Sequence, residues 1–181
     1  MSVPCWFWIA EPYFNHLDRD LPLRVLQIGV FSGDATEWLL KNRNVEKIYD
    51  VDTWAGGPDH DSMGIDFAEV ERLYDSRVAG DDRVLKFKMT SDEFFASNKN
   101  TYNFIYIDGD HTALQTAKDA IKAWRVLDVG GVLAFDDFEW VSPDGERKNA
   151  PKDGIYGFVY TIQGQFSIVL SGYQLWIRKE K

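Results

Sequence analysis

The sequence predicts an α/β fold in which helices cover both faces of a mostly parallel, seven-stranded sheet. Five short apolar segments alternate with helical patterns between residues 23 and 135, which is typical of repeated strand–helix–strand units. Several of these segments end abruptly in glycine or aspartate, as parallel strands do at a ligand-binding edge. Residues 166–170 and 173–178 flank Ser171 and Gly172 and predict a terminal antiparallel hairpin.

The individual elements follow from apolar spacing and capping residues. The five predicted parallel strands are residues 23–30, 47–52, 83–89, 102–107 and 132–135. Asp34, with Glu37 three residues later, is the expected N-cap of the first helix, and Ser91 that of a short later helix. Apolar residues at helical spacing predict a helix over about residues 66–79 and another that ends before Gly130.

After the fifth predicted strand the pattern changes. Residues 138–154 are rich in polar side chains and are expected to form a loop. Residues 155–162 are expected to be helical despite their glycines, and the hairpin follows. The C-terminal part therefore closes the predicted sheet.

The composition indicates one domain. With 181 residues, of which 45% are hydrophobic and 15% aromatic, the chain is expected to form one core over residues 1–181. Residues 1–22 carry aromatic side chains without a clear period and are expected to form a short lid or an oligomer contact, which favours a homo-oligomer. The single cysteine, Cys5, excludes an internal disulfide and is compatible with a cytoplasmic protein.

The charge of the chain limits its partners. The formal net charge is −9, whereas nucleic acids and anionic membranes require a basic face. No apolar segment is long enough for a membrane span. We therefore expect a small-molecule partner, with no nucleic acid and no membrane.

A glycine pair lies between the first predicted strand and the first helix. Gly29 permits a tight turn, Gly33 permits a close approach to a ligand, and the helix N-terminus offers free N–H groups. The third glycine of the dinucleotide fingerprint is missing, so NAD is disfavoured. Asp52 ends the next strand, where a carboxylate can accept both hydroxyls of a ribose. Asp50 is a weaker candidate, and glycines in such turns are also common for structural reasons alone.

Three carboxylates follow the fourth and fifth predicted strands. Asp108, Asp136 and Asp137 lie where adjacent parallel strands end, so the fold is expected to bring them together. Crowded carboxylates raise one another's pKa values unless a cation is present, and Mg²⁺ prefers oxygen ligands. The sequence therefore predicts a magnesium site. In the alternative, Asp136 and Asp137 only cap the following loop, and Asp108 binds a cofactor or water.

His111 and Asp110 are the candidates for a proton acceptor. An unperturbed histidine has a pKa near 6.5, and His111 closely follows Asp108. We therefore expect His111 to act as a general base. Asp110 is the second candidate, or the partner that orients His111. In the simpler alternative, His111 only begins the next helix and Asp110 is its N-cap.

Five motifs together resemble the class I S-adenosylmethionine-dependent methyltransferases. In chain order they are residues 25–33 (VLQIGVFSG), 49–54 (YDVDTW), 106–111 (YIDGDH), 130–137 (GGVLAFDD) and 172–179 (GYQLWIRK). Within this class the chain is similar to the small-molecule O-methyltransferases of the macrocin and aminocoumarin sugar type, which are grouped with cephalosporin-hydroxylase-like sequences. The resemblance covers residues 23–181 and implies a Rossmann-like methyltransferase fold.

The resemblance also implies a binding site for S-adenosylmethionine. Gly29 and Gly33 are expected to flank its methionine part, and Asp52 to hold the ribose. Trp54 is expected to cover the adenine, or in the alternative only to pack against the protein. Where this sequence has Gln27, the family usually has an acidic residue that holds the ammonium group of the cofactor, so that contact must weaken or move. The full set of expected cofactor-binding residues is Gln27, Gly29, Gly33, Asp52, Thr53, Trp54, Thr90, Ser91 and Asp108.

In the family an aspartate after the fourth strand and an acidic pair after the fifth bind a divalent ion, which corresponds here to Asp108, Asp136 and Asp137. The resemblance thus implies Mg²⁺-assisted O-methylation of a small hydroxylated molecule, a sugar or a phenol. Two alternatives stay open. One is a metal-independent N- or O-methyltransferase on the same fold, and the other is an S-adenosylmethionine-binding protein without turnover.

Overall fold

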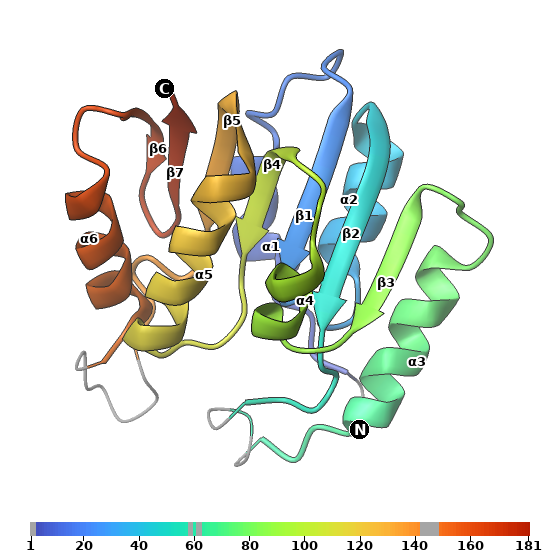
Figure 1. Ribbon diagram of the computed structural model, residues 1–181. Helices are drawn as coiled ribbons and strands as arrows, with labels where there is room; N and C mark the ends of the chain where they lie inside the picture. The colour runs from blue at the N-terminus through green and yellow to red at the C-terminus, as the bar shows by residue number, and fades with distance from the viewer. Residues whose placement is uncertain (1–2, 58–59, 61–62, 142–148) are drawn as a thin grey trace.

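The computed structural model describes residues 3–57, 60, 63–141 and 149–181. It confirms the predicted fold class: a seven-stranded sheet has the order β3-β2-β1-β4-β5-β7-β6, and only β7 runs antiparallel to its neighbours (Figure 1). The strands are β1 (Leu23–Ile28), β2 (Val45–Asp52), β3 (Val84–Lys88), β4 (Tyr102–Ile107), β5 (Leu127–Phe135), β6 (Phe166–Ser171) and β7 (Leu175–Lys179).

The described residues form six helices, which lie on the two faces of the sheet (Figure 1). Strand alternation sends Phe104 toward α1 and α2 and sends its neighbour Ile105 toward α5 and α6, and both side chains are fully buried. α3 packs beside α2. The helices are α1 (Phe7–Phe14), α2 (Asp34–Asn42), α3 (Phe67–Val78), α4 (Ser91–Ser97), α5 (Ala113–Val126) and α6 (Pro151–Thr161).

The N-terminal segment contains a helix, which the sequence pattern did not predict. α1 is apolar on most sides and includes Pro12, so it has no helical period to detect. Phe14 at its end is fully buried, with edge contacts to the rings of Phe104, Tyr106 and Trp176 at 4.9–5.8 Å between centroids. Part of the segment expected to be a lid or an oligomer contact is thus anchored in the core.

Two predicted boundaries in the second half of the chain are wrong. β5 starts at Leu127, directly after α5, and runs through Gly130. Gly130 has a φ of +84°, and the register between β5 and β4 shifts nearby. Together these features mark a β-bulge, which the glycine permits. α6 starts at Pro151, four residues before the predicted helix, because proline is well suited to the first helical turn. Residues 142–148 of the predicted loop lie outside the described residues.

Two helix caps also differ from the prediction. Gly33, with φ of +80°, is the N-cap of α2 in place of Asp34. Thr90 caps α4 in place of Ser91, and its side chain and that of Glu93 form a reciprocal capping box. This arrangement leaves the Ser91 hydroxyl available for another contact.

Gly154 holds α6 close to α5. A Cβ atom at this position would lie 2.1 Å from the carbonyl oxygen of Ala113. We therefore expect Gly154→Ala to lower the free energy of unfolding by about 3 kcal/mol, measured by urea denaturation. Gly157→Ala, in the same helix but with open space around its Cβ, is the matched control, and it should raise stability by about 0.5–1 kcal/mol. Equal effects of the two variants would contradict this account of the packing.

Candidate active site

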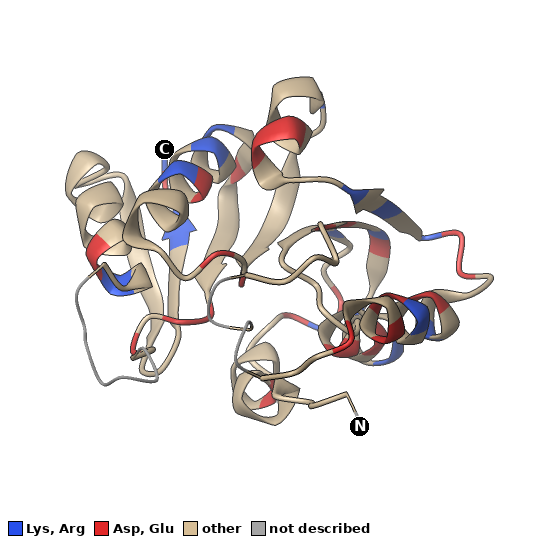
Figure 2. Cartoon of the chain, turned by 90° about the horizontal axis from the view of Figure 1, so that it is seen from below, with Lys and Arg blue, Asp and Glu red and all other residues tan. Residues whose placement is uncertain are grey.

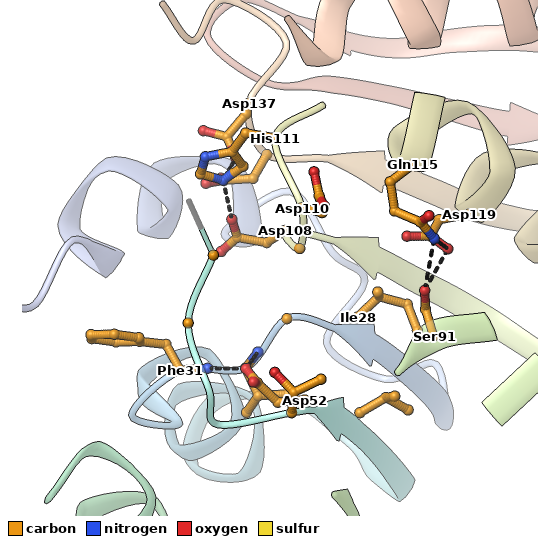
Figure 3. A pocket seen from close by; sticks show the side chains of 18 of the residues that line it. Ile28, Phe31, Asp52, Ser91, Asp108, Asp110, His111, Gln115, Asp119 and Asp137 are labelled. Carbon is orange, nitrogen blue, oxygen red and sulfur yellow. Dashed lines mark hydrogen bonds and ion pairs between the residues drawn. The ribbon is translucent and has the colours of Figure 1, made fainter. Parts of the chain in front are cut away.

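A cavity of about 660 Å³ opens at the carboxyl ends of the parallel strands. It lies where the chain order reverses between β1 and β4, the usual ligand position in open α/β sheets. Figure 3 shows three polar groups around it: Asp52 at the end of β2, a group around Asp108 and His111, and a group around Asp119 on α5. The volume lies within the range of small-molecule sites.

The glycine turn after β1 is built against β4. Gly29 lines the cavity with φ of +82°, and a Cβ atom there would lie 1.8 Å from the backbone oxygen of Asp108. Only glycine allows this backbone approach. Gly29 thus fixes the distance between the turn and the start of the acidic segment.

Asp52 is fastened to the same turn. Its Oδ2 accepts hydrogen bonds from the backbone N–H groups of Val30 and Phe31, at 2.7 and 2.9 Å, and its Oδ1 accepts one from the N–H of Trp54 at 2.7 Å. Figure 3 shows the carboxylate beside the cavity. The position expected for a ribose ligand is therefore rigid and lies in the cavity, together with Thr53.

Three residues expected at the cofactor lie away from the cavity lining. Gly33 makes room for a ring, because its Cβ would lie 2.8 Å from Tyr74. Trp54 is 5% exposed and packs on the same ring, and its indole N–H donates to the Phe31 carbonyl at 2.8 Å. Gln27 is buried below the turn. Packing and hydrogen bonds fix all three positions, and their contacts with a cofactor stay a prediction.

A buried polar network surrounds Gln27. Its amide donates to Asp50 Oδ1 at 2.7 Å and to the Thr36 hydroxyl at 2.8 Å, and Thr36 and Tyr74 donate to Asp50 Oδ2 at 2.8 and 3.0 Å. Asp50 is fully buried. Asp50 therefore supports the turn from below and does not line the cavity.

This network gives stability a predictable pH dependence. Burial raises the pKa of Asp50 to about 6, against the lowering effect of its three hydrogen-bond donors. An unfolded aspartate has a pKa near 3.9, so the folded protein holds the proton of Asp50 more tightly than the unfolded chain does. The stabilisation from protonated Asp50 is therefore complete below about pH 3.9 and is lost as the pH rises through 6. We expect the free energy of unfolding to fall by about 3 kcal/mol from this group between pH 4 and 7.5. Urea titrations of the protein and of Asp50→Asn isolate this component, and an identical pH profile for the variant would contradict it.

Asp108, His111 and Asp137 form the acidic cluster of the site. Their potential ligand atoms lie within 4.8 Å of one another. His111 Nε2 lies 2.9 Å from Asp137 Oδ2 and 4.0 Å from Asp108 Oδ1. Figure 3 shows the three side chains grouped together. The structure thus brings Asp108 and Asp137 together as predicted, and it adds His111, the expected base, to their group.

Asp136 has hydrogen-bond partners outside the acidic cluster. Its Oδ1 accepts a hydrogen bond from the Tyr106 hydroxyl at 2.5 Å and another from the Gln174 amide. Gln174 is in turn fixed by the indole N–H of Trp176, at 2.7 Å. The third carboxylate expected at the metal therefore has its own partners, although Asp136 also borders the cavity.

The carboxylates disturb one another's ionisation. Burial and the nearby charges of Asp136 and Asp137 raise the pKa of Asp108 well above its ordinary value, against the lowering effect of His111. Burial and Asp137 raise the pKa of Asp136 to about 7. A cation at the acidic cluster would reverse this trend by favouring the charged carboxylates.

Asp110 lies at the edge of the cavity and is exposed. One carboxylate oxygen accepts the backbone N–H of Thr112 at 2.7 Å. Thr112, and not Asp110, is the N-cap of α5, since its hydroxyl accepts the N–H of Gln115. The expected simple role of Asp110 as the helix N-cap is therefore wrong.

A third polar group lies at the opposite end of the cavity, where Thr90 and Ser91 were predicted to bind the cofactor, but Asp119 and Gln115 were not predicted. Asp119 Oδ1 accepts hydrogen bonds from the Ser91 hydroxyl at 2.7 Å and from the Gln115 amide at 3.1 Å. Thr90 borders the cavity beside them. An aspartate on the buried stripe of an otherwise amphipathic helix was the available signal.

Aromatic side chains from distant segments complete the lining. Trp6 and Ile9 of the α1 segment, Trp140 after β5 and Tyr173 before β7 all border the cavity. The Trp140 ring lies 4.9 Å from that of His111, and the Tyr173 hydroxyl donates to Asp137 at 3.5 Å. These residues have no common sequence pattern, because tertiary packing alone brings them together.

The sheet order, with an antiparallel β7 inserted between β5 and β6, is that of the Rossmann-like methyltransferases. A family model described as a methyltransferase domain matches residues 26–138. The chain therefore belongs to this methyltransferase family. No curated protein matches it in a sequence search.

Solved structures of methyltransferases share the fold at low sequence identity. An rRNA methylase from Streptococcus thermophilus has a TM-score of 0.66 at 12% identity, with 100% of both chains covered. SMU.1697c from Streptococcus mutans, in complex with SAH, has a TM-score of 0.67 at 12% identity, covering 98% of this chain and 99% of that one. The O-methyltransferase NovP has a TM-score of 0.63 at 16% identity, covering 96% and 76%.

None of the helices formed by the described residues is both long enough and apolar enough to cross a membrane.

Proposed function

We propose that this methyltransferase transfers a methyl group from S-adenosylmethionine to a hydroxyl oxygen of a small molecule, assisted by a divalent cation. The observation that carries the proposal is the presence, around one cavity, of the rigid Asp52 carboxylate and the acidic cluster. The Asp52 carboxylate is suited to a ribose, and the acidic cluster is suited to a cation. Cofactor and acceptor can therefore meet in the same space.

S-adenosylmethionine suits the cavity in size and chemistry. A volume of about 660 Å³ accommodates the cofactor together with a small acceptor. Asp52 offers its carboxylate to the ribose hydroxyls, and Thr90 and Ser91 border the end where the base would lie. The bound SAH of the Streptococcus mutans protein supports this choice.

The acidic cluster fits a divalent cation. Asp108, His111 and Asp137 offer two carboxylates and one imidazole with donor atoms within 4.8 Å of one another. Burial, together with the nearby charges of Asp136 and Asp137, raises the pKa of Asp108. Oxygen ligands favour Mg²⁺, while the imidazole makes Mn²⁺ equally suitable. When bound, such an ion supplies a positive charge that favours the deprotonated acceptor hydroxyl.

Asp110 is the proton acceptor in this proposal, because His111 is engaged with Asp137. The acceptor oxygen attacks the methyl carbon, the bond from that carbon to sulfur breaks, and S-adenosylhomocysteine leaves while the hydroxyl proton passes to Asp110. The protein contributes by holding the two reactants in line and by excluding water. Trp140 and Tyr173 border the acceptor end of the cavity.

The charge of the site favours a small neutral or cationic acceptor over RNA. Seven aspartates, and no lysine or arginine, are among the described residues that line the cavity. Figure 2 looks onto this edge and shows acidic segments on the central loops, with most basic segments on the surrounding helices and strands. Binding of RNA depends on cationic contacts to phosphate. The similarity to NovP, described as an O-methyltransferase, supports oxygen as the methyl acceptor.

A metal-independent methyltransferase is the second candidate. The separation of 2.9 Å between His111 Nε2 and Asp137 Oδ2 is also that of a general base and the carboxylate that orients it. In this version His111 takes the proton from the acceptor. The two versions differ in their response to chelation.

We expect calorimetry to detect binding of S-adenosylhomocysteine, and we expect turnover on a panel of phenols and sugars to fall at least tenfold in EDTA and to recover with Mg²⁺ or Mn²⁺. The recovery follows from the electrostatic role of the cation. Full activity in EDTA would refute the metal and favour the second candidate. Absence of S-adenosylhomocysteine binding would refute the cofactor assignment.

A further inference from the structure

Tyr173 connects the turn before β7 to the acidic cluster. The residue borders the cavity, and its hydroxyl lies 3.5 Å from Asp137 Oδ1. Because an ionised carboxylate can only accept hydrogen bonds, the tyrosine is the donor. The other carboxylate oxygen of Asp137 lies 2.9 Å from His111 Nε2. Each oxygen of Asp137 thus has its own partner, and the two contacts together fix the rotation of the carboxylate.

The backbone of Tyr173 is held on both sides. Its N–H donates to the hydroxyl oxygen of Tyr13 at 2.8 Å, and its carbonyl accepts the N–H of Glu139 at 3.1 Å. Gly172, directly before it, leaves room for the Tyr13 hydroxyl, because a Cβ atom there would lie 2.5 Å from that oxygen. Two distant segments, α1 and the segment after β5, therefore determine where the Tyr173 hydroxyl lies.

Tyr13 has a well-anchored position near the end of α1. The next residue, Phe14, is fully buried among the aromatic rings of the core. The carbonyl oxygen of Phe14 also accepts a hydrogen bond from the Arg43 guanidinium at 2.8 Å. Because the end of α1 is fixed in this way, the Tyr13 hydroxyl is a stable attachment point for the turn before β7.

We propose that Tyr13 is a positioning residue for the acidic cluster: it fixes the turn before β7, and Tyr173 in turn holds Asp137 in the orientation that suits a cation. The inference rests on the cation of the proposed function. Hydrogen bonds that orient metal ligands increase the affinity for the metal, and loss of such a partner typically costs 10- to 100-fold. Tyr13 is not among the described residues that line the cavity, so its effect passes through Tyr173.

The test measures Mn²⁺ affinity by electron paramagnetic resonance on the full chain. Tyr173→Phe removes the donor to Asp137 and should weaken binding about tenfold, the lower end of the range for such partners, because the contact of 3.5 Å is long. Tyr13→Phe removes the acceptor of the Tyr173 N–H and should weaken binding about threefold. In the Tyr173→Phe background, Tyr13→Phe should have no further effect, because the hydroxyl that Tyr13 positions is then absent.

Tyr102→Phe is the matched control. Tyr102 also uses its hydroxyl in a hydrogen bond of 2.8 Å, to Asn98 Oδ1, but it is not among the described residues that line the cavity. This variant should keep the Mn²⁺ affinity of the unmodified protein. A loss of affinity equal to that of Tyr13→Phe would show that any missing tyrosine hydroxyl has this effect, and it would refute the positioning role.

The remaining outcomes separate this inference from the proposed function. If the unmodified protein does not bind Mn²⁺, the proposed cation fails and this inference fails with it. If Mn²⁺ binds but Tyr13→Phe keeps the full affinity, or lowers it equally with and without the Tyr173 hydroxyl, only the positioning role is refuted. If Tyr13→Phe does not fold, Gly172→Ala is the second variant, since its methyl group displaces the Tyr13 hydroxyl. Its loss of affinity should likewise require the Tyr173 hydroxyl, and an equal loss without that hydroxyl refutes the inference.

Discussion

Replacing Gly29 by alanine is expected to abolish binding of S-adenosylhomocysteine and to lower the free energy of unfolding by at least about 3 kcal/mol. The new Cβ atom would lie 1.8 Å from the Asp108 backbone oxygen, and the residue holds a φ of +82°. No rotation of a side chain relieves a contact between two backbones. The end of β1 must move away from β4, which separates the turn that holds Asp52 from the acidic cluster.

Gly80→Ala is the matched control for this variant. Gly80 has a nearly equal φ of +78°, but open space surrounds its Cβ position, so the control measures the cost of the left-handed backbone alone. That cost is about 1 kcal/mol. Urea denaturation and calorimetry of both variants give the comparison. Similar stability and normal ligand affinity in both variants would show that the β1 turn tolerates the side chain.

Asp108→Asn is expected to weaken binding of Mn²⁺ by at least about 100-fold, because second-shell changes alone already cost 10- to 100-fold. Methyl transfer should fall with it. The same change should stabilise the metal-free protein at pH 8, because it removes one of three crowded charges, and the raised pKa of Asp108 shows that its ionised form is unfavourable in the fold. This increase in stability should disappear at a pH low enough to protonate Asp108 in the folded protein, because the substitution then removes no charge.

Asp110→Asn is the informative comparison for this experiment. Asp110 lies outside the acidic cluster, so its replacement should reduce turnover while Mn²⁺ affinity, measured by electron paramagnetic resonance, stays within about threefold. Undiminished Mn²⁺ binding by Asp108→Asn would remove Asp108 from the metal site. Equal losses of affinity in both variants would contradict the separation of the metal site from the base.

The fold was predictable from the sequence because its central strands are buried on both faces. Residues 102–107 are apolar apart from Asn103 and coincide with β4, and the helices between the parallel strands have one apolar stripe each. α1 was not predicted, because a short helix with apolar residues on most sides lacks a period. The start of β5 was misplaced because Gly130 ordinarily ends an element, whereas here it forms a bulge within a strand.

The positions of site residues were predictable where a residue lies at or directly after the end of a strand. Asp52 and Asp108 lie at the carboxyl edge, as predicted, since backbone topology places them there. Asp136 and Asp137 lie in the turn after β5, where the alternation of strand side chains does not apply, so the sequence could not show which partner each carboxylate would meet. Asp136 meets Gln174 and Asp137 meets His111. The contacts of Asp119 could not be predicted, because they join α4 and α5 across the core.

The insertion of β7 between β5 and β6 ties the acidic edge of the sheet to the C-terminal part of the chain. β7 pairs directly with β5, with Phe135 opposite Leu175, so the strand that leads into Asp136 and Asp137 is held on one side by the C-terminal hairpin. Gln174, which donates to Asp136, lies one residue before β7. The side-chain position of Asp136 therefore depends on the pairing of this hairpin as well as on the parallel strands.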